Sequence, residues 1–597
     1  MRRTTTDLKE MIRAGKGDIP ADLVIKNGNL INVSSEEIYP ADVAIYKDKI
    51  VAIGNVEDYI GPDTTLLDVD GKYIAPGLID GHIHSECSKM SITSFAKAVV
   101  PAGTTSMISG LDEYLVTSGL EGLREVLDEM KQSPLKVFWG APFKTPYTFP
   151  TSTVGFNVTK EVHKEVQTWP ECYGVWETVR EFIQEEDEDA LGAIEVADTN
   201  RLPVFGCAPM ARGKDLNSYL CAGVRLDHES YDHEEVVEKI RNGMYMLIRE
   251  SSVTHFLDEN MRAVTEVNPH MARRISFCTD DVTASDVLTK GHVDNLVRMT
   301  IKKGVPPIKA IQMGSINSAE AYRIDHLVGS VSPGKVADVL IVDSPESFNV
   351  LKVISKGELV AENGKMIKKI TPPPRSKALT DTMNVAPVSA DDFALKTDYT
   401  TPKVNVLSMS VTVDSPFERK RRDVVLKVEN GVVMPDTEQD ALYVTVVERY
   451  GKTNNKPIGF CSGWKLKSGA MASSAAPDDN NIVCIGTNKD DMAIAVNCII
   501  ETGGGQVVVD NGEIVEFLPL PIGGIVSDIE PAEMAEKEKK LDDAARALGC
   551  DLPEPFMYMF FLPITAIPDY AMTDIGTIDC ISLQKIDPVL GGVNNDD

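Results

Sequence analysis

The chain has 597 residues, a length that predicts several domains rather than one hydrophobic core. Its composition, 43% hydrophobic and 25% charged, is typical of a globular protein. With 90 acidic against 60 basic residues, the formal net charge is −30, which argues against a general nucleic-acid or anionic-membrane binder, because phosphate binding depends on clustered cations.

We expect no secretory signal, since Met1-Arg2-Arg3 runs into Thr4-Thr5-Thr6 with no apolar stretch behind it. No uncharged apolar run approaches the roughly 18 residues that a membrane span needs. The 10 cysteines are scattered, without the spacing of a disulfide framework, and this pattern suits a reducing compartment. We therefore expect a cytoplasmic protein that binds neither nucleic acid nor membranes.

Two β-rich segments flank the middle of the chain. Residues 22–70 alternate short apolar strands with turns such as Asn27-Gly28. A similar pattern returns at 328–367, where Lys356-Gly357 predicts another turn. Two segments of one style predict a single small β-sandwich domain, formed by residues 1–75 and 328–370 and interrupted by an insertion.

The middle of the chain, from about residue 74 to residue 327, alternates apolar strands with amphipathic helices. Eight strand candidates end near His82, Ser109, Trp139, Glu177, Gly206, Arg225, Arg249 and Asp280. Eight βα repeats over about 250 residues predict an α/β fold of the (β/α)8 TIM-like barrel type, which we place at residues 76–327.

The remainder of the chain predicts a linker and a further domain. Residues 371–402 contain Pro372-Pro373-Pro374 and have the composition of a linker. Residues 403–597 carry their own apolar strands, a Gly503-Gly504-Gly505 turn and a charged helix around 532–547. We expect a C-terminal α+β domain there.

The clearest chemical signal is Asp80-Gly81-His82-Ile83-His84, directly after the apolar stretch 73–79. Residues i and i+2 of a strand project from the same face, so both imidazoles can reach one metal ion. A barrel places such residues at its catalytic, C-terminal rim.

Later barrel strands also end in potential metal ligands. Imidazole, carboxylate and thiolate groups are the donors for zinc, iron or manganese. Taken singly, each of these residues is more simply structural, and it is their recurrence at successive strand ends that indicates a metal centre. The candidates are Glu177, Cys207, His228 and Asp280.

Segments along nearly the whole chain resemble the adenine deaminases of the amidohydrolase superfamily. The HxH motif and the segment Pro333-Gly334-Lys335-Val336-Ala337-Asp338 indicate the superfamily. The adenine deaminase group is indicated by Gly213-Lys214-Asp215-Leu216-Asn217, Asp227-His228-Glu229, Thr279-Asp280-Asp281 and, nearer the C-terminus, Gly469-Ala470-Met471-Ala472-Ser473-Ser474.

The resemblance implies a centre of one or two divalent ions, Mn, Fe or Zn. Its ligands would be His82, His84, Glu177, Cys207, His228 and Asp280, with Glu177 bridging. A water polarised to hydroxide would attack the carbon that bears the amino group of adenine or a related amino-heterocycle. Asp280 would accept the water's proton and pass it on, so that ammonia leaves.

The same resemblance assigns residues around the metals. Glu86 and Glu113 match catalytic acids near the site, and Asp112 is expected to contact substrate. Arg249, at a strand end, would pair with an acid or orient the substrate ring. The expected partner is a small-molecule substrate, and members of this superfamily are commonly homo-oligomers.

Five histidines of the family's motifs are replaced in this chain. The family's GHAPG, DPHE, ERH and HDSHN segments read here Gly206-Cys207-Ala208-Pro209-Met210, Gly110-Leu111-Asp112-Glu113, Glu448-Arg449-Tyr450 and Pro477-Asp478-Asp479-Asn480-Asn481. A thiolate at Cys207 would favour zinc or iron over manganese. Because the HxH motif and Asp280 persist, the pattern favours a working hydrolase with an altered pocket.

Two other functions stay open. The same metal chemistry could hydrolyse a cyclic or linear amide, since function depends on the site and not on the fold. Release of ammonia, as against formation of a carboxylate, separates these two reactions. The third hypothesis is a non-catalytic binding paralogue, whose site would fail to hold metal.

Overall fold

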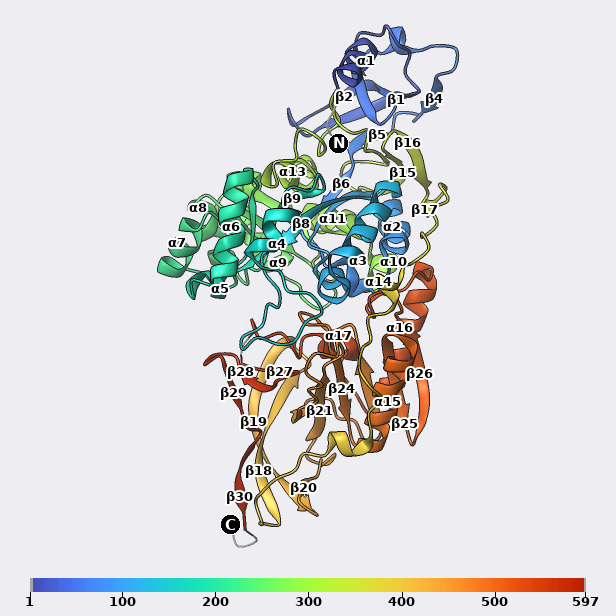
Figure 1. Ribbon diagram of the computed structural model, residues 1–597. Coiled ribbons are helices and arrows are strands. Elements are labelled where there is room, and N and C mark those ends of the chain that lie inside the picture. Colours follow the sequence, from blue (N-terminus) through green and yellow to red (C-terminus); the bar gives the residue numbers. More distant parts are fainter. Residues whose placement is uncertain (1–3, 568, 595–597) are drawn as a thin grey trace.

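The computed structural model describes residues 4–567 and 569–594. An N-terminal β module, a central barrel and a C-terminal domain follow one another along the molecule (Figure 1). Among the described residues, no helix combines the length and the apolar character that crossing a bilayer requires.

Eight parallel strands, β6 to β13, form the central sheet in chain order. Their bounds are β6 Leu78–Asp80, β7 Thr104–Ser109, β8 Lys136–Pro142, β9 Cys172–Val179, β10 Val204–Cys207, β11 Leu226–Asp227, β12 Tyr245–Arg249 and β13 Ile275–Cys278. The sheet closes on itself after β6 and β13, where the N–H of Gly81 donates to the carbonyl of Phe277 at 3.0 Å and the N–H of His84 to that of Asp280 at 2.8 Å. The predicted TIM-like barrel is confirmed.

Helices cover the outside of this sheet (Figure 1). The longer ones are α2 Ile92–Val99, α3 Asp112–Gln132, α6 Glu188–Asn200, α7 Gly213–Cys221, α8 His233–Arg241 and α11 Val293–Lys302, and the shorter ones are α4 Lys160–Val166, α5 Arg180–Gln184, α9 Leu257–Asn260, α10 Ala284–Lys290, α12 Pro307–Met313 and α13 Ile316–Ala321. Their starts show ordinary capping: the Asp232 carboxylate, for example, accepts the N–H of Glu235 at the first turn of α8.

The sixth strand lies later in the chain than the sequence predicts. We expected it to end near Arg225, whereas β11 comprises only Leu226–Asp227. Helix α7 runs to Cys221, and Gly223 (φ 95°) turns the chain out of the helix in the left-handed conformation. The chain therefore enters the sheet only at Leu226, directly before His228.

Segments from both sides of the barrel form one mixed nine-stranded sheet, which confirms the predicted composite β module. The segments meet where β5 (Tyr73–Pro76) pairs antiparallel with β14 (Val339–Val342). The other strands are β1 Leu23–Asn32, β2 Glu37–Tyr46, β3 Lys49–Gly54, β4 Thr65–Asp68, β15 Val350–Ser355, β16 Glu358–Glu362 and β17 Lys365–Met366. Helix α1 (Thr5–Gly15) packs Ala14 into an apolar cluster beside this sheet.

The two predicted turns of this module differ in outcome. Lys356 and Gly357 (φ 52° and 82°) form the expected tight turn between β15 and β16. Asn27-Gly28 instead lies inside β1 as a bulge, because the N–H of Asn27 donates to the Asp42 carboxylate and keeps the two strands paired past the bulge.

The C-terminal domain is built on a ten-stranded sheet and a small three-stranded sheet. The strands are β18 Lys403–Thr412, β19 Ser415–Glu429, β20 Val432–Val433, β21 Leu442–Val447, β22 Ile458–Ser462, β23 Ala470–Ser473, β24 Ile482–Gly486, β25 Gly505–Asp510, β26 Glu513–Pro519 and β30 Val589–Val593, then β27 Tyr570–Thr573, β28 Gly576–Asp579 and β29 Gln584–Ile586. The helices are α15 Lys489–Thr502, α16 Pro531–Ala547 and α17 Pro555–Phe560. The predicted α+β character is confirmed.

The segment 371–402, predicted as a linker, packs against both of its neighbours. It contains a short helix, α14 (Lys377–Thr380), and buries Leu379 and Phe393. The Arg375 guanidinium pairs with Glu129 of the barrel helix α3 and, at 2.6 Å, with Asp528 of the C-terminal domain. The segment therefore contacts both domains through buried side chains and ion pairs. The limits of the domains stay a prediction.

Arg375→Ala should destabilise the native chain by about 3 kcal/mol, because it leaves the buried Glu129 carboxylate without its cation. Thermal unfolding measures the effect. Arg421→Ala is the matched control, since Arg421 pairs with Asp423 on the exposed surface. Equal melting temperatures for the two variants would show that the Arg375 pairs do not hold the domains together.

Candidate metal centre and catalytic cavity

Asp80, at the end of β6, fixes the positions of two strand ends that carry predicted ligands. Its fully buried carboxylate accepts the N–H groups of His82 and Thr279, both at 3.2 Å, and the Thr279 hydroxyl at 2.5 Å. His292 Nε2 lies 3.1 Å from the same carboxylate. A side chain at Gly81 would lie 2.8 Å from the carbonyl oxygen of Phe277, so only glycine fits between the two strands.

Five of the predicted ligands converge at this end of the barrel. Glu177 Oε2 lies 3.0 Å from His82 Nε2 and 3.7 Å from His84 Nε2. His228 Nε2 lies 3.7 Å from Glu177 Oε1 and 3.5 Å from Asp280 Oδ2. Asp280 Oδ1 is 3.8 Å from His84 Nε2. Glu177 therefore stands between three imidazoles, as a bridging ligand would.

The donors fit a divalent cation. The potential ligand atoms of His82, His84 and Glu177 lie within 4.8 Å of one another, and so do those of His82, His228 and Asp280. Neither ring nitrogen of the buried His82 has a hydrogen-bond partner, nor has Glu177 Oε2. Because buried polar atoms are rarely left unpaired, these atoms indicate a ligand between them.

The surroundings orient the imidazoles. His228 Nδ1 lies 3.0 Å from the carbonyl of Gly206, which directs Nε2 toward the carboxylates. The His82 ring is stacked between the rings of Trp176 and His228, with centroid distances of 4.0 and 3.6 Å. Glu177 and Asp280 adopt left-handed backbone conformations (φ 54° and 60°), which are uncommon for non-glycine residues.

Arg249 pairs with three carboxylates of the site. It lies 2.8 Å from Asp280 and also pairs with Glu229 and Asp281. Burial opposes ionisation of Asp280, yet Arg249 and the nearby imidazoles hold the pKa of Asp280 below its usual value. Burial raises the pKa of Asp281 to about 6 in spite of the same guanidinium. Of the two predicted roles of Arg249, the geometry favours pairing with acids.

Three further predicted acids lie around His84. Asp112 is buried, with Oδ1 3.3 Å from His84 Nδ1. Burial and the charge of Asp112 raise the pKa of Glu86 to about 7 and the pKa of Glu113 well above its usual value. Glu113 lines the cavity and accepts a hydrogen bond from the Asn480 amide. Asp112 and Glu86 do not line the cavity.

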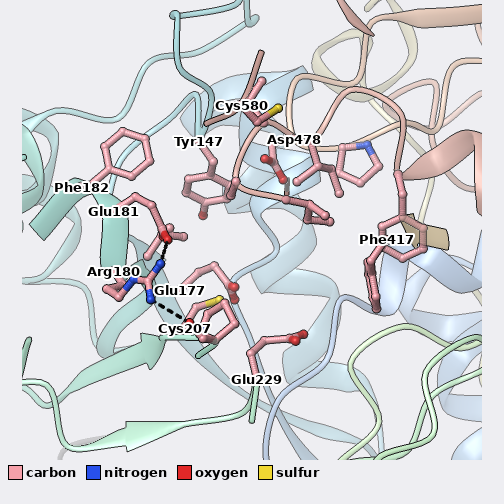
Figure 2. A pocket seen from close by; sticks show the side chains of 18 of the residues that line it. Tyr147, Glu177, Arg180, Glu181, Phe182, Cys207, Glu229, Phe417, Asp478 and Cys580 are labelled. Atoms are coloured by element: carbon pink, nitrogen blue, oxygen red, sulfur yellow. Dashed lines mark hydrogen bonds and ion pairs between the residues drawn. The ribbon is translucent and has the colours of Figure 1, made fainter. Parts of the chain in front are cut away.

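A cavity of about 570 Å³ lies between the barrel rim and the C-terminal domain. Glu177, Cys207 and Glu229 line its barrel side, and Asp478 and Phe417 enter from the C-terminal domain (Figure 2). The site is therefore completed by residues that lie far from the barrel in the sequence.

Cys207, at the end of β10, lies beside the metal donors. Its sulfur lies within 4.8 Å of potential ligand atoms of Glu177 and His228. Burial and the charge of Glu177 raise the pKa of the Cys207 thiol well above its usual value. The thiol therefore needs a bound cation to become a thiolate ligand.

Several residues of the site were not predicted. Glu229 and Asp281 pair with Arg249, and each directly follows a predicted ligand, so their place in the motifs was an available signal. Trp176, which stacks on His82, precedes Glu177 on β9, where the sequence pattern indicates only a strand residue. The C-terminal lining residues, such as Phe561, carry no local signal in the sequence.

The rewritten C-terminal segments face the barrel. The Tyr450 hydroxyl donates to the carbonyl of Asp479 at 2.5 Å, and the amide of Asn481 donates to the carbonyl of Thr153 at 2.9 Å. The Glu448 carboxylate accepts backbone N–H groups of the loop that follows it, including that of Thr453 at 3.0 Å. Of these segments, Pro477 and Asp478 line the cavity.

Comparison with known proteins gives two family matches. Residues 73–360 match the Amidohydrolase family, and residues 417–584 match the Adenine deaminase C-terminal domain. The chain is 66% identical to Adenine deaminase 1 of Desulfotalea psychrophila and 58% identical to Adenine deaminase 4 of Rhizobium meliloti, in both cases over 98% of each chain. It is 54% identical to Adenine deaminase 1 of Latilactobacillus sakei, again over 98% of both.

Among solved structures, the chain is similar to the β-aspartyl dipeptidase of Fervidobacterium islandicum. The TM-score is 0.45 at 19% sequence identity, and the match covers 58% of this chain and 98% of that one.

Asp80→Asn should weaken metal binding about ten- to a hundredfold, because an amide cannot accept all the hydrogen bonds that hold His82 and Thr279 in place. Competition with a chelator of known affinity measures this. Asp391→Asn, at a side chain that is 97% exposed, is the control. Unchanged affinity in Asp80→Asn would show that the strand ends keep their positions without this carboxylate.

Proposed function

The chain belongs to the adenine deaminases of the amidohydrolase family, and on that premise we propose that it removes the exocyclic amino group of adenine or a related amino-heterocycle by hydrolysis. The observation that carries the proposal is the convergence of His82, His84, Glu177, His228 and Asp280 at the barrel end of the cavity. In the reaction a C–N bond breaks and a C–O bond forms, water supplies the oxygen, and ammonia leaves.

We propose that these five residues hold one or two divalent ions, and that Cys207 supplies a further ligand. A bound ion would contribute Lewis acidity, which makes water a nucleophile near neutral pH. Because a thiolate takes part, zinc or iron suits the site better than manganese. Glu177, between the three imidazoles, would be shared if two ions bind.

Asp280 and Glu113 have the properties of a base and an acid. Asp280, whose pKa is lowered, is ionised at neutral pH and can accept a proton from the attacking water. Glu113, whose pKa is raised by burial and by Asp112, can hold a proton and donate it toward the leaving amine from the cavity side. Separate pKa values for two nearby carboxyl groups are a common arrangement in acid–base catalysis.

The other predicted residues support these two. Asp112 lies against His84 Nδ1, so we propose that it orients this imidazole rather than contacts the substrate. Glu86 does not line the cavity, and we propose that its charge acts on the pKa of Glu113 rather than on the substrate directly. Arg249 keeps Asp280 in its ionised, proton-accepting form.

We also propose a cytoplasmic location and a homo-oligomeric state. All 10 cysteines lie within the described residues and are free thiols, as expected in a reducing compartment. The oligomeric state rests on the family relationship, and light scattering of the purified protein determines it.

The metal-loaded protein should release ammonia from adenine and form the corresponding oxo-purine. His82→Ala and Asp280→Ala should each lower kcat/KM about 10²- to 10⁴-fold or more. The first removes a proposed metal ligand, and the second removes the proposed proton acceptor. Ammonia assay together with chromatography of the purine measures both. The control is Asp63→Asn, at an exposed carboxylate outside the barrel.

If adenine and a panel of amino-heterocycles release no ammonia while amides yield carboxylates, the chain is an amide hydrolase. If elemental analysis finds less than about one metal per chain after reconstitution, the site does not function as a metal centre. Full activity of either alanine variant would contradict the roles assigned to His82 and Asp280.

Cobalt substitution should test the thiolate ligand. The cobalt-loaded chain should show an intense near-ultraviolet thiolate-to-cobalt band, and Cys207→Ser should remove it because the serine hydroxyl stays protonated. Cys580→Ser is the matched control, since this thiol lines the same cavity at the C-terminal side. A cobalt-loaded wild type without the band would show that Cys207 is not a ligand.

A further inference from the structure

The cavity extends well beyond the metal donors. Its volume of about 570 Å³ lies in the range of pockets that enclose drug-sized molecules, and a bare aminopurine fills only part of it. Met210 of the barrel and Ile581 of the C-terminal domain line the cavity and are 54% and 73% exposed, which places them at its opening.

Six apolar side chains line the cavity between the metal donors and this opening, and we call them the apolar wall. They are Phe149, Phe182, Phe560, Phe561, Ile564 and Ile567. Phe149 and Phe182 come from the barrel side and stack with their ring centroids 4.2 Å apart. The other four belong to one apolar cluster of the C-terminal domain, which also contacts Cys87 of the barrel.

A buried guanidinium fixes the C-terminal part of the apolar wall. Arg419 is fully buried, and its guanidinium donates hydrogen bonds to carbonyl groups of the segment 561–567, including that of Ile564 at 2.8 Å and those of Phe561 and Ile567. Burying this cation is unfavourable, and burial lowers the pKa of Arg419. The segment is therefore held in place as a preformed surface.

The charged groups of the cavity disfavour an anionic substituent. The two arginines that line it are engaged: Arg249 with three carboxylates, and Arg180 with Glu181 and, at 2.9 Å, the carbonyl of Pro209 (Figure 2). Several acidic side chains also line the cavity, among them Asp215 and Asp478. Among the described lining residues, a phosphate would find no unpaired cation.

From this geometry we infer that the preferred substrate is an amino-heterocycle with an uncharged alkyl or aryl substituent on its ring. The substituent lies against the apolar wall and reaches toward Met210 and Ile581, while the carbon that bears the amino group faces the metal donors. The inference rests on the deaminase function proposed above and specifies its substrate class.

Steady-state kinetics with the metal-loaded chain test this inference. The probes are adenine and its 2-, 8- and 9-substituted methyl, butyl and benzyl derivatives, all of which lose the same amino group. At one ring position at least, butyl or benzyl should raise kcat/KM tenfold or more over adenine, because each buried methylene contributes to binding in an apolar pocket. If every position leaves kcat/KM unchanged or lowers it, the inference is wrong.

Two variants locate the effect. Ile581→Ser at the exposed opening and Phe182→Ala in the apolar wall should each lower the ratio of kcat/KM for the favoured derivative to that for adenine about fivefold or more. Ile514→Ser is the matched control, since Ile514 is 50% exposed on β26 and does not line the cavity. A ratio that stays constant in both variants contradicts a substituent at the apolar wall.

Binding of the oxo products, measured by calorimetry, separates this inference from the proposed function. Tighter binding of the butyl or benzyl product than of hypoxanthine, with loss of the difference in Ile581→Ser, supports the apolar wall even if turnover is slow. Deamination of adenine without any gain from a substituent, in kinetics or in binding, supports the deaminase function and overturns the substrate class.

Discussion

The buried carboxylate of Asp80 is the contact on which the metal centre depends. The barrel closes where β6 meets β13, and the residues just past these two strands are the HxH pair and Asp280. One carboxylate accepts the backbone N–H groups of His82 and Thr279, so the two ligand-bearing segments cannot shift relative to each other. Gly81 allows the close approach, because any side chain there would meet the Phe277 carbonyl. These contacts set the positions of His82, His84 and Asp280. The register of the neighbouring strands then sets how far these side chains lie from Glu177 and His228.

That arrangement concentrates negative charge in a place with little water. Glu86, Asp112, Glu113, Glu177, Asp280 and Asp281 are all buried at one end of the barrel. Arg249 compensates part of this charge, and the imidazoles compensate more when they are protonated or bind a cation. Because charge compensation is uneven, the pKa shifts differ: Arg249 and the imidazoles hold the pKa of Asp280 below its usual value, whereas burial and Asp112 raise the pKa of Glu113 well above it. The same uneven environment that makes a cation favourable at Glu177 therefore gives the proposed base and the proposed acid opposite pKa shifts.

Much of the barrel and of the metal centre could be predicted from the sequence, because both depend on local patterns. Apolar strands followed by helices have a clear period, and ligands at strand ends follow those strands directly, as His82, Glu177 and His228 do. Two predictions depended on competition between neighbours and were wrong in detail: α7 extends to Cys221 and delays β11, and Asn27-Gly28 forms a bulge because Asp42 holds the strands together. The C-terminal wall of the cavity could not be predicted, since Phe561 and Ile564 meet the barrel only through tertiary packing. Arg419 shows the limit most clearly: it reads as one more surface cation in Glu418-Arg419-Lys420-Arg421, yet it is fully buried.

The placement of the C-terminal domain decides what the metal chemistry can act on. The barrel rim supplies the candidate metal ligands, the proposed base and one side of the cavity, and the C-terminal domain supplies the other side. Asn480 reaches across to Glu113, and the segment 561–567 covers the cavity from above, so the acid and the apolar wall belong to the same domain contact. A change in how that domain packs would alter both the protonation of Glu113 and the shape offered to a substrate. The residues proposed for the reaction and those of the apolar wall are different, but both depend on the contact between the barrel and the C-terminal domain. That coupling explains how the motifs that face the C-terminal domain can be rewritten while the donors on the barrel strands are kept.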